Sequence, residues 1–117
     1  MKLYKQLPDK LPFDTQKPLM FDTETMHGFG GRTRLVQLHQ DGVSIVLDCY
    51  YMSVEDIKPL LHPYTLVAHN IMYDLSCVDF AGWLPTDIHD TMHLAKCYMP
   101  KLESFSLNTV ADHFGLS

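Results

Sequence analysis

The stretch PLMFDTET, residues 18–25, decides the fold, because its apolar run ends in Asp22 and Glu24. Side chains alternate between two faces along a β-strand, so both carboxylates are expected to point to one face, at the rim of a sheet. Two like charges held that close repel each other unless a cation lies between them. Hard divalent ions such as Mg²⁺ prefer carboxylate oxygens and keep positions open for water and phosphate. The stretch therefore predicts a metal-dependent phosphate site, and the plainer alternative is a solvated turn.

Length and composition describe one globular domain. The 117 residues are 46% hydrophobic and 20% charged, which is enough apolar material for a core. No apolar run approaches the length of a membrane span, and residues 1–17 lack the apolar centre of a signal peptide. The net charge of −5 argues against a protein that coats duplex DNA through a broad basic surface. The negative net charge is compatible with an enzyme that binds a few nucleotides around catalytic carboxylates. We expect a cytoplasmic protein with no membrane partner.

The cysteine and histidine patterns do not favour a zinc site. Cys49, Cys77 and Cys97 are odd in number and far apart, and they contain no CxxC pair. They are therefore expected to be reduced thiols in an intracellular protein. Among the histidines no HExxH spacing occurs, and His89 and His93 have no third partner nearby in the sequence.

The first part of the chain predicts an antiparallel meander. Residues 1–17 carry prolines and are expected to form an extended lead-in segment, so that the domain proper runs from 18 to 117. Three strands should follow, joined by a glycine-rich turn at 26–31 and an Asp-Gly hairpin turn at 41–42; they are expected at 19–25, 34–40 and 43–48.

From residue 53 onward the pattern alternates between helices and strands. Ser53, Asp90 and Ser106 are expected helix caps, and Gly82 and Gly115 are expected helix ends. The predicted helices span 53–61, 70–81, 90–100 and 107–114, and the predicted strands span 65–68 and 86–88. A meander followed by βαβ units implies an α/β fold with a mixed sheet, three antiparallel strands plus parallel ones, and flanking helices. This arrangement resembles the ribonuclease H-like superfamily.

A second segment, LVAHNIMYDL at residues 66–75, adds a third carboxylate. Asn70 lies at the expected strand–helix junction, and Asp74 lies one turn further along. If the strands at 19–25 and 65–68 are neighbours, Asp74 faces Asp22 and Glu24 across the strand ends. Taken alone, Asp74 would be an exposed acid and Asn70 a helix cap. Their joint placement predicts three carboxylates around one concave point.

These segments together resemble a known family. Residues 21–25 are similar to the first motif of the DEDD family of 3′–5′ exonucleases, and residues 66–75 to the second. The stretches DTMHLA at 90–95 and SLNTVA at 106–111 are similar to the sequence that follows those motifs. The combination is typical of the proofreading domains of family A DNA polymerases and their phage relatives. The resemblance covers residues 19–117 and implies a bacterial or phage-infected cell as the setting.

The resemblance implies a mechanism with two divalent cations, Mg²⁺ or Mn²⁺. Asp22 would bridge the two ions. Glu24 would hold the ion that carries the attacking water, and Asp74 would support the second ion. The reaction would be hydrolysis of 3′-terminal phosphodiester bonds of DNA, as in proofreading during replication. An RNA-trimming enzyme of the same superfamily is an alternative that the motifs do not separate.

The resemblance also implies residues that contact the substrate, a single-stranded 3′ end of DNA or RNA. They are Thr23, Thr25, Met26, His27 and Asn70. For Met26 and His27, which follow the first motif directly, the alternative is that they are ordinary turn residues.

One feature of the family pattern is missing. A fourth carboxylate is expected on a late helix, in a YxxxD or HxxxxD motif, but Tyr98 is followed by Leu102 and Asp112 has no Tyr or His at the required distance. The chain is therefore expected to lack the last helix of the family and to be a fragment or split-gene product. A polymerase domain, a second polypeptide or a second copy would then supply the helix.

Two other interpretations stay open. The chain could be a degenerate module that binds nucleic acid or assembles with a partner without hydrolysis, or another acid could substitute. Asp87, Asp90 and Asp112 are the candidates, although Asp90 is better explained as a helix cap and Asp112 as a solvent-facing residue. Three carboxylates should hold the first ion loosely, so the chain alone is expected to be a weak or inactive exonuclease. The missing helix should also leave an apolar strip exposed.

Overall fold

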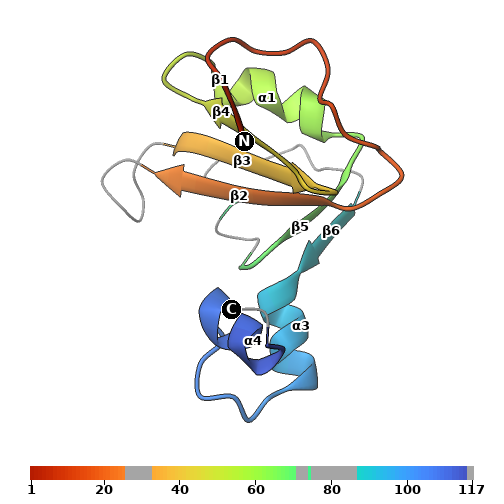
Figure 1. The fold of residues 1–117 in the computed structure, drawn as a ribbon, viewed down its shortest axis with the longest axis vertical. Coiled ribbons are helices and arrows are strands. Elements are labelled where there is room, and N and C mark those ends of the chain that lie inside the picture. Colours follow the sequence, from red (N-terminus) through yellow and green to blue (C-terminus); the bar gives the residue numbers. More distant parts are fainter. Residues whose placement is uncertain (26–32, 71–73, 75–86, 116–117) are drawn as a thin grey trace.

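The computed structural model describes residues 1–25, 33–70, 74 and 87–115, and within these ranges the strands form one mixed sheet (Figure 1). The strand order is β1-β4-β3-β2-β5-β6. The central strands β2, β3 and β4 are antiparallel, whereas β1, β5 and β6 each run parallel to their neighbour. The strands span Lys2–Tyr4, Leu19–Thr25, Thr33–Gln40, Val43–Asp48, Thr65–Ala68 and Asp87–Asp90. The predicted α/β class and the meander are confirmed.

The hairpin between β3 and β4 has the geometry that its sequence predicts. Asp41 and Gly42 both have positive φ, 50° and 80°. Two consecutive positive φ values are characteristic of the two-residue turn whose twist matches antiparallel strands, and Asp-Gly is a preferred sequence for it. The turn fixes the register of β3 on β4, with Gln40 opposite Val43.

The helices begin at the predicted caps. Helix α1 spans Val54–Leu61, α3 spans Thr91–Tyr98 and α4 spans Leu107–His113. Ser53 Oγ accepts a hydrogen bond from Glu55 N, and Ser106 Oγ accepts one from Thr109 N. None of the described helices has the length and apolar character needed to cross a membrane. The predicted helix at 70–81 with its Gly82 end and the glycine-rich turn at 26–31 lie outside the described residues, apart from Asn70 and Asp74.

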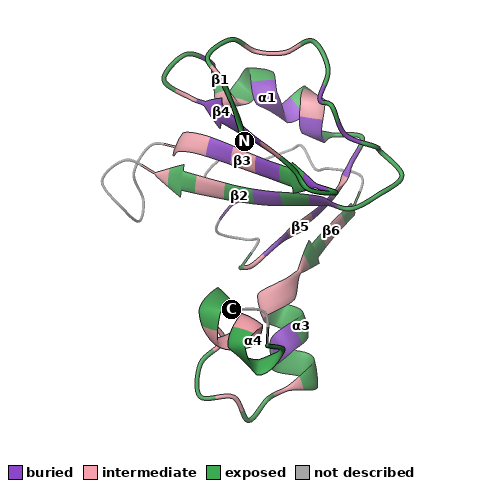
Figure 2. Ribbon diagram, in the orientation of Figure 1, coloured by how far each residue is buried: buried purple, intermediate pink, exposed green. Residues whose placement is uncertain are grey.

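The main core lies between one face of the sheet and α1. Burial alternates along β2, where Leu19 and Phe21 are buried and Met20 and Asp22 are exposed (Figure 2). The buried side chains of this core come from all the central strands, from α1 and from the segment before β2: Leu11, Phe13, Leu19, Phe21, Val36, Leu38, Ile45, Leu47, Met52, Ile57, Leu61, Tyr64, Leu66 and Ala68. The odd positions of β2 therefore build the core, and the even positions face the opposite side of the sheet.

The lead-in segment is more ordered than the sequence indicates. It contributes β1, which pairs with β4, and it buries Leu11 and Phe13 in the core. A three-residue strand is too short to show a period of two, which is why the pattern does not reveal it. The domain boundary at residue 18 stays a prediction, but in space the lead-in packs on the sheet.

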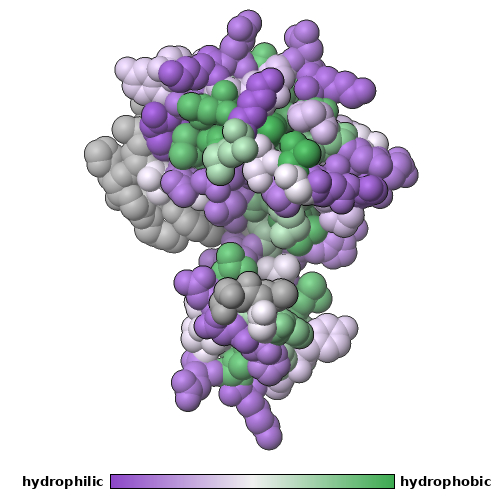
Figure 3. All heavy atoms as spheres, in the orientation of Figure 1, coloured by the Kyte–Doolittle hydropathy of each residue, from purple (hydrophilic) through white to green (hydrophobic). Residues whose placement is uncertain are grey.

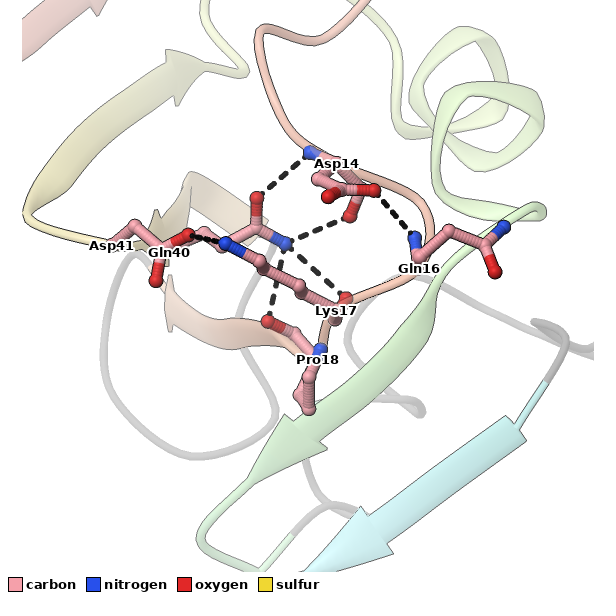
Figure 4. A network of polar contacts seen from close by, with 6 residues as sticks. All are labelled: Asp14, Gln16, Lys17, Pro18, Gln40 and Asp41. Atoms are coloured by element: carbon pink, nitrogen blue, oxygen red, sulfur yellow. Dashed lines mark hydrogen bonds and ion pairs between the residues drawn. The ribbon is translucent and has the colours of Figure 1, made fainter.

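A buried glutamine ties this segment to β3 (Figure 4). Gln40 Oε1 accepts from Asp14 N at 2.7 Å. Its Nε2 donates to the carbonyl oxygens of Asp14, Lys17 and Pro18 at 2.9, 3.2 and 3.3 Å. Beside it, Lys17 Nζ donates to Asp41 Oδ2 at 2.8 Å. A single side chain thus satisfies four backbone groups that a loop could not pair by itself.

The last strand differs from its prediction. The sequence predicts a strand at 86–88, whereas β6 spans Asp87–Asp90 and ends directly at helix α3. Asp90 therefore closes the strand and caps the helix. In Figure 1, α3 and α4 lie together on the far side of β5 and β6 from α1.

Candidate active site

The carboxylates of β2 lie on the face of the sheet opposite to α1. Asp22 and Glu24 are both exposed there, as the alternation of side chains predicts. Gln37 of β3 lies directly opposite Asp22, and its Nε2 donates to Glu24 Oε1 at 3.1 Å. Gln37 of the neighbouring strand β3 therefore fixes the position of the Glu24 carboxylate.

Asp74 reaches β2 where the ladder with β5 ends. Within the described residues, the ladder between β5 and β2 consists of the pairs at Leu19 and Met20, and Thr23 lies beyond it. Asp74 Oδ1 accepts from Thr23 N at 3.0 Å and from Thr23 Oγ1 at 2.6 Å. The side chain of Asp74 is only 4% exposed. The plain interpretation of Asp74 as an exposed helix acid is therefore wrong.

The carboxylates affect one another's charge. Burial raises the pKa of Asp74 to about 6; the hydrogen bonds from Thr23 oppose this rise, and the charges of Asp22 and Asp90 add to it. Burial also raises the pKa of Asp22, and the charge of Glu24 raises it further. Asp22 therefore lies within electrostatic range of both Glu24 and Asp74.

The backbone at Asn70, after β5, is held by one acid. Asn70 has a φ of 63°, in the left-handed region that asparagine tolerates better than most residues. Its backbone N donates to Asp90 Oδ1 at 2.9 Å. The same oxygen accepts from Met92 N at 2.9 Å and His93 N at 3.3 Å. The predicted role of Asp90 as a cap is confirmed, and the structure adds the contact with the turn.

His69 joins the end of β5 to the helical pair. Its Nδ1 lies 2.9 Å from Thr91 Oγ1, and its Nε2 lies 2.5 Å from the carbonyl oxygen of Phe105. A carbonyl only accepts, so Nε2 carries a proton. His69 therefore links the end of β5 to the start of α3 and to the loop before α4.

A groove of about 750 Å³ opens beside the carboxylates, between the sheet face and the pair α3–α4. The sheet side includes Met20, Asp22 and Val67, and the helical side includes Tyr98 and Phe114. Figure 3 shows apolar surface on the α3–α4 unit. Tyr98 is 81% exposed and Phe114 is 61% exposed, so this wall of the groove presents large apolar side chains to solvent. The volume falls in the range of pockets that hold small ligands.

The three carboxylates offer the donor set of a hard cation, since they are oxygen ligands that repel one another. As placed, however, no three His, Cys, Asp or Glu side chains in the described part of the chain lie close enough together to hold a metal ion. Free thiols are found at Cys49 and Cys97, and Cys77 lies outside the described residues. The chemistry of the ligands fits Mg²⁺ or Mn²⁺, while a complete coordination shell is not formed by these residues alone.

The other predicted site residues fall into separate groups. Thr23 contacts Asp74 instead of facing the groove, and Thr25 pairs with Thr33 beyond a register shift at which β3 has one extra residue. Asn70 is exposed beside Asp90. Met26 and His27 lie outside the described residues.

Gln37 and the bond between Asp90 and Asn70 are the site contacts that the sequence does not reveal. Gln37 could be found only from the register of β3 on β2, which places it opposite Asp22. Asp112, one of the candidate substitutes for a fourth carboxylate, is exposed, as its interpretation as a solvent-facing residue predicts.

No protein-family model matches the chain. A similar curated protein is DNA polymerase I of Aquifex aeolicus (strain VF5), which is 32% identical over 96 residues; these are 81% of this chain and 16% of that protein. Brucella melitensis NrnC has a TM-score of 0.76 at 21% identity, over 97% of this chain and 59% of that one. Escherichia coli RNase D has a TM-score of 0.64 at 21% identity, over 84% of this chain and 28% of that one.

The chain thus spans less than two thirds of the length of each of these relatives. Because their sequence identities to this chain are low, the two solved structures show similarity of fold alone. The sheet order, the antiparallel meander with its parallel neighbours and the match to DNA polymerase I agree with one another. The chain has the ribonuclease H-like fold of the DEDD family of 3′–5′ exonucleases.

Proposed function

We propose that this chain is a 3′–5′ exonuclease domain that hydrolyses 3′-terminal phosphodiester bonds of DNA, as in proofreading during replication. One observation carries the proposal. The two hydrogen bonds from Thr23 to Asp74 Oδ1 bring a buried acid from a distant segment to the end of the central strand β2, beside Asp22 and Glu24. A buried acid whose pKa is raised further by a neighbouring acid lowers stability unless it serves a cation.

In this proposal Asp22, Glu24 and Asp74 would hold two divalent cations. When bound, such ions supply an activated water and neutralise charge on the phosphate. Thr23 fixes the carboxylate of Asp74, and Gln37 orients Glu24. The groove beside Asp22 would receive the terminal nucleotide. The structure of Brucella melitensis NrnC with bound Mg²⁺, at 20% identity, supports the choice of ion.

Removal of nucleotides from RNA is a second candidate. The match to DNA polymerase I favours DNA, whereas solved structures of similar fold favour RNA. These are Brucella melitensis NrnC bound to pGG and Trypanosoma brucei RNase D in complex with RNA U12.

A further partner is part of the proposal. Large apolar side chains stay exposed on the helical wall of the groove, among them Leu94, Leu107 and Phe114. Contiguous apolar surface of this kind is typical of interfaces. A polymerase domain, a second polypeptide or a second copy of the chain would cover it and complete the site.

Mn²⁺ binding tests the metal site apart from turnover. Titration of the purified chain with Mn²⁺, followed by the loss of the free-ion electron paramagnetic resonance signal, should show saturable binding. The double variant Asp22→Asn, Glu24→Gln should lose it, whereas Asp112→Asn, a change of an exposed acid on α4, should keep it. Equal Mn²⁺ affinity in all three proteins would refute the proposed site.

Cleavage tests the reaction. Oligonucleotides of DNA and RNA that carry a 5′ label are incubated with excess protein and Mn²⁺, so that even slow turnover is visible. The proposal expects shortening from the 3′ end, abolished in the same double variant. Faster trimming of RNA than of DNA would support the second candidate. Intact substrate after long incubation with a metal-binding protein would support the non-catalytic alternative.

A further inference from the structure

Two exposed tyrosines follow strand β4. Tyr50 is 75% exposed and Tyr51 is 52% exposed, and their rings meet edge to face with centroids 5.2 Å apart. Neither ring belongs to the core cluster, whose members come from the sheet, from α1 and from the lead-in segment. Two adjacent aromatic residues in solvent leave apolar surface unburied, so packing does not explain them.

Cations lie over both rings. The guanidinium carbon of Arg34 lies 5.6 Å from the Tyr50 ring centroid, and Lys5 Nζ lies 5.6 Å from the Tyr51 ring centroid. Lys2 Nζ lies 4.7 Å from the ring of Tyr4, on the neighbouring strand β1. The two distances of 5.6 Å are close to the outer limit of such contacts, and contacts at exposed sites are weak. A ligand with its own aromatic face can therefore displace the cations.

A buried acid sets the geometry of this turn. Asp48 is buried at the end of β4, forms an ion pair with Arg34 and accepts from Tyr50 N at 3.0 Å. The backbone also closes the turn, since Tyr51 N donates to the carbonyl oxygen of Asp48 at 3.0 Å. Tyr50, Tyr51, Arg34 and Lys5 thus form a preorganised patch, hereafter the tyrosine surface.

The tyrosine surface lies at the same end of the sheet as the carboxylates. Glu24 of β2 pairs with Leu35 of β3, which pairs with Asp48 of β4. Neighbouring strands lie about 4.8 Å apart, so the backbone of Asp48 is about 10 Å from that of Glu24. In Figure 1 the turn between β4 and α1 lies at the end of the sheet to which the arrow of β2 points, displaced toward α1. A strand of nucleic acid that ends at Asp22 would reach this surface by passing over that end of the sheet.

We propose that the tyrosine surface binds single-stranded nucleic acid upstream of its 3′ end, with bases stacked on Tyr50 and Tyr51 and phosphates near Lys5 and Arg34. The assignment rests on the proposed function. Aromatic faces flanked by cations are the usual means by which single strands are held without sequence preference. The positive charge of Lys5 lowers the repulsion that the net charge of −5 exerts on a polyanion at this surface, whereas the charge of Arg34 is already balanced by Asp48.

Binding of labelled oligothymidylates of two and ten nucleotides, followed by fluorescence anisotropy in EDTA, tests the surface without metal or cleavage. The double variant Tyr50→Ala, Tyr51→Ala should bind the ten-nucleotide strand at least about fivefold more weakly, the lower range for one lost stack. The dinucleotide makes fewer contacts with the surface than the ten-nucleotide strand, so it should bind the unsubstituted chain more weakly and lose less affinity in this variant. The double variant Tyr50→Phe, Tyr51→Phe keeps the stacking faces and should bind normally.

A charge test complements the aromatic one. Lys5→Gln should reduce the slope of log affinity against log salt by about 0.7, the value for one phosphate contact on a single strand. Val43→Ala, at the opposite end of β4, serves as the control for an exposed apolar residue. Unchanged affinity of the double alanine variant for the ten-nucleotide strand, or no binding by the unsubstituted chain, would overturn the tyrosine surface. Loss of Mn²⁺ binding or cleavage alone would instead count against the proposed function.

Discussion

The environment of Asp74 in the structure differs from the one that its sequence position alone suggests. Its position in the sequence allows an exposed helix acid, yet it is buried and accepts two hydrogen bonds from Thr23. An acid whose pKa rises to about 6 is destabilising when ionised, because the folded protein holds its proton more tightly than the unfolded chain does. A buried acid whose ionised form destabilises the fold is a candidate for a functional role.

The substitution Asp74→Asn should therefore stabilise the metal-free chain at neutral pH. The penalty for the ionised acid is absent well below pH 4, grows between about pH 4 and 6, and is complete above pH 6, where it reaches about 3 kcal/mol. Urea unfolding at pH 4.5 and 7.5 should show the advantage of the variant growing by about 2 kcal/mol between the two. Asp112→Asn, on the surface, should show no such growth. A constant difference between Asp74→Asn and the unsubstituted chain at both pH values would contradict this account.

Thr23 is expected to matter through its hydroxyl group. Thr23→Val removes the 2.6 Å hydrogen bond to Asp74 while keeping the shape and the backbone donor. The loss should cost about 1–3 kcal/mol of unfolding free energy at neutral pH, since a buried charged acceptor loses a partner. Thr23→Ser restores the donor and is the matched control. If the serine variant were as unstable as the valine variant, packing of the methyl group and not the hydrogen bond would be the cause.

At the scale of elements, the sheet depends on how its edges are anchored. The lead-in segment is held by Gln40, whose side chain serves four backbone groups, and by Leu11 and Phe13 in the core. At the other end, Asp90 and His69 join β5, β6 and α3. The Gln40 contacts and the Asp90 and His69 contacts both fix segments whose hydrophobic patterns are too weak to specify where they pack.

Gln40→Leu should loosen the lead-in. The change leaves Asp14 N and three carbonyl oxygens without this partner, and the expected loss in unfolding free energy is about 2–3 kcal/mol. Gln16→Leu, a change of an exposed residue in the same segment, should cost less than about 0.5 kcal/mol. Urea unfolding measures both, and limited proteolysis should cut the Gln40→Leu variant within residues 1–17 first. Equal stability of the two variants would show that the Gln40 network is dispensable.

The order of elements, by contrast, follows from local rules. The Asp-Gly turn, the Ser53 and Ser106 caps and the alternation in β2 all lie where the sequence predicts them. The two errors, β1 and the length of β6, concern strands of three and four residues, and such strands are too short for their period to be seen.

For the whole molecule, the carboxylate cluster should couple metal binding to stability. At about 100 times its dissociation constant, Mn²⁺ should stabilise the chain by about 2.7 kcal/mol at pH 7.5, or about 10 °C in Tm. At pH 5 this gain should fall to about half, because Asp74, with a pKa near 6, is mostly protonated and the apparent dissociation constant rises about tenfold. Thermal melts with and without Mn²⁺ at both pH values measure the effect.

The double variant Asp22→Asn, Glu24→Gln separates site binding from general ionic effects. It should melt at the same temperature with and without Mn²⁺ at either pH. A rise in Tm of this variant equal to that of the unsubstituted chain would place the ion elsewhere on the molecule.

The sequence by itself determined the central antiparallel strands, the caps and the carboxylate pair, because alternation along a strand and hydrogen bonding at a helix start act over a few residues. It also indicated Asp74 through its spacing from Asn70. Only the tertiary structure decided that Asp74 is buried against Thr23, that Gln37 holds Glu24 and that Asp90 supports the turn at Asn70. These contacts join residues far apart in the chain, so they depend on strand order and register, which no local pattern specifies.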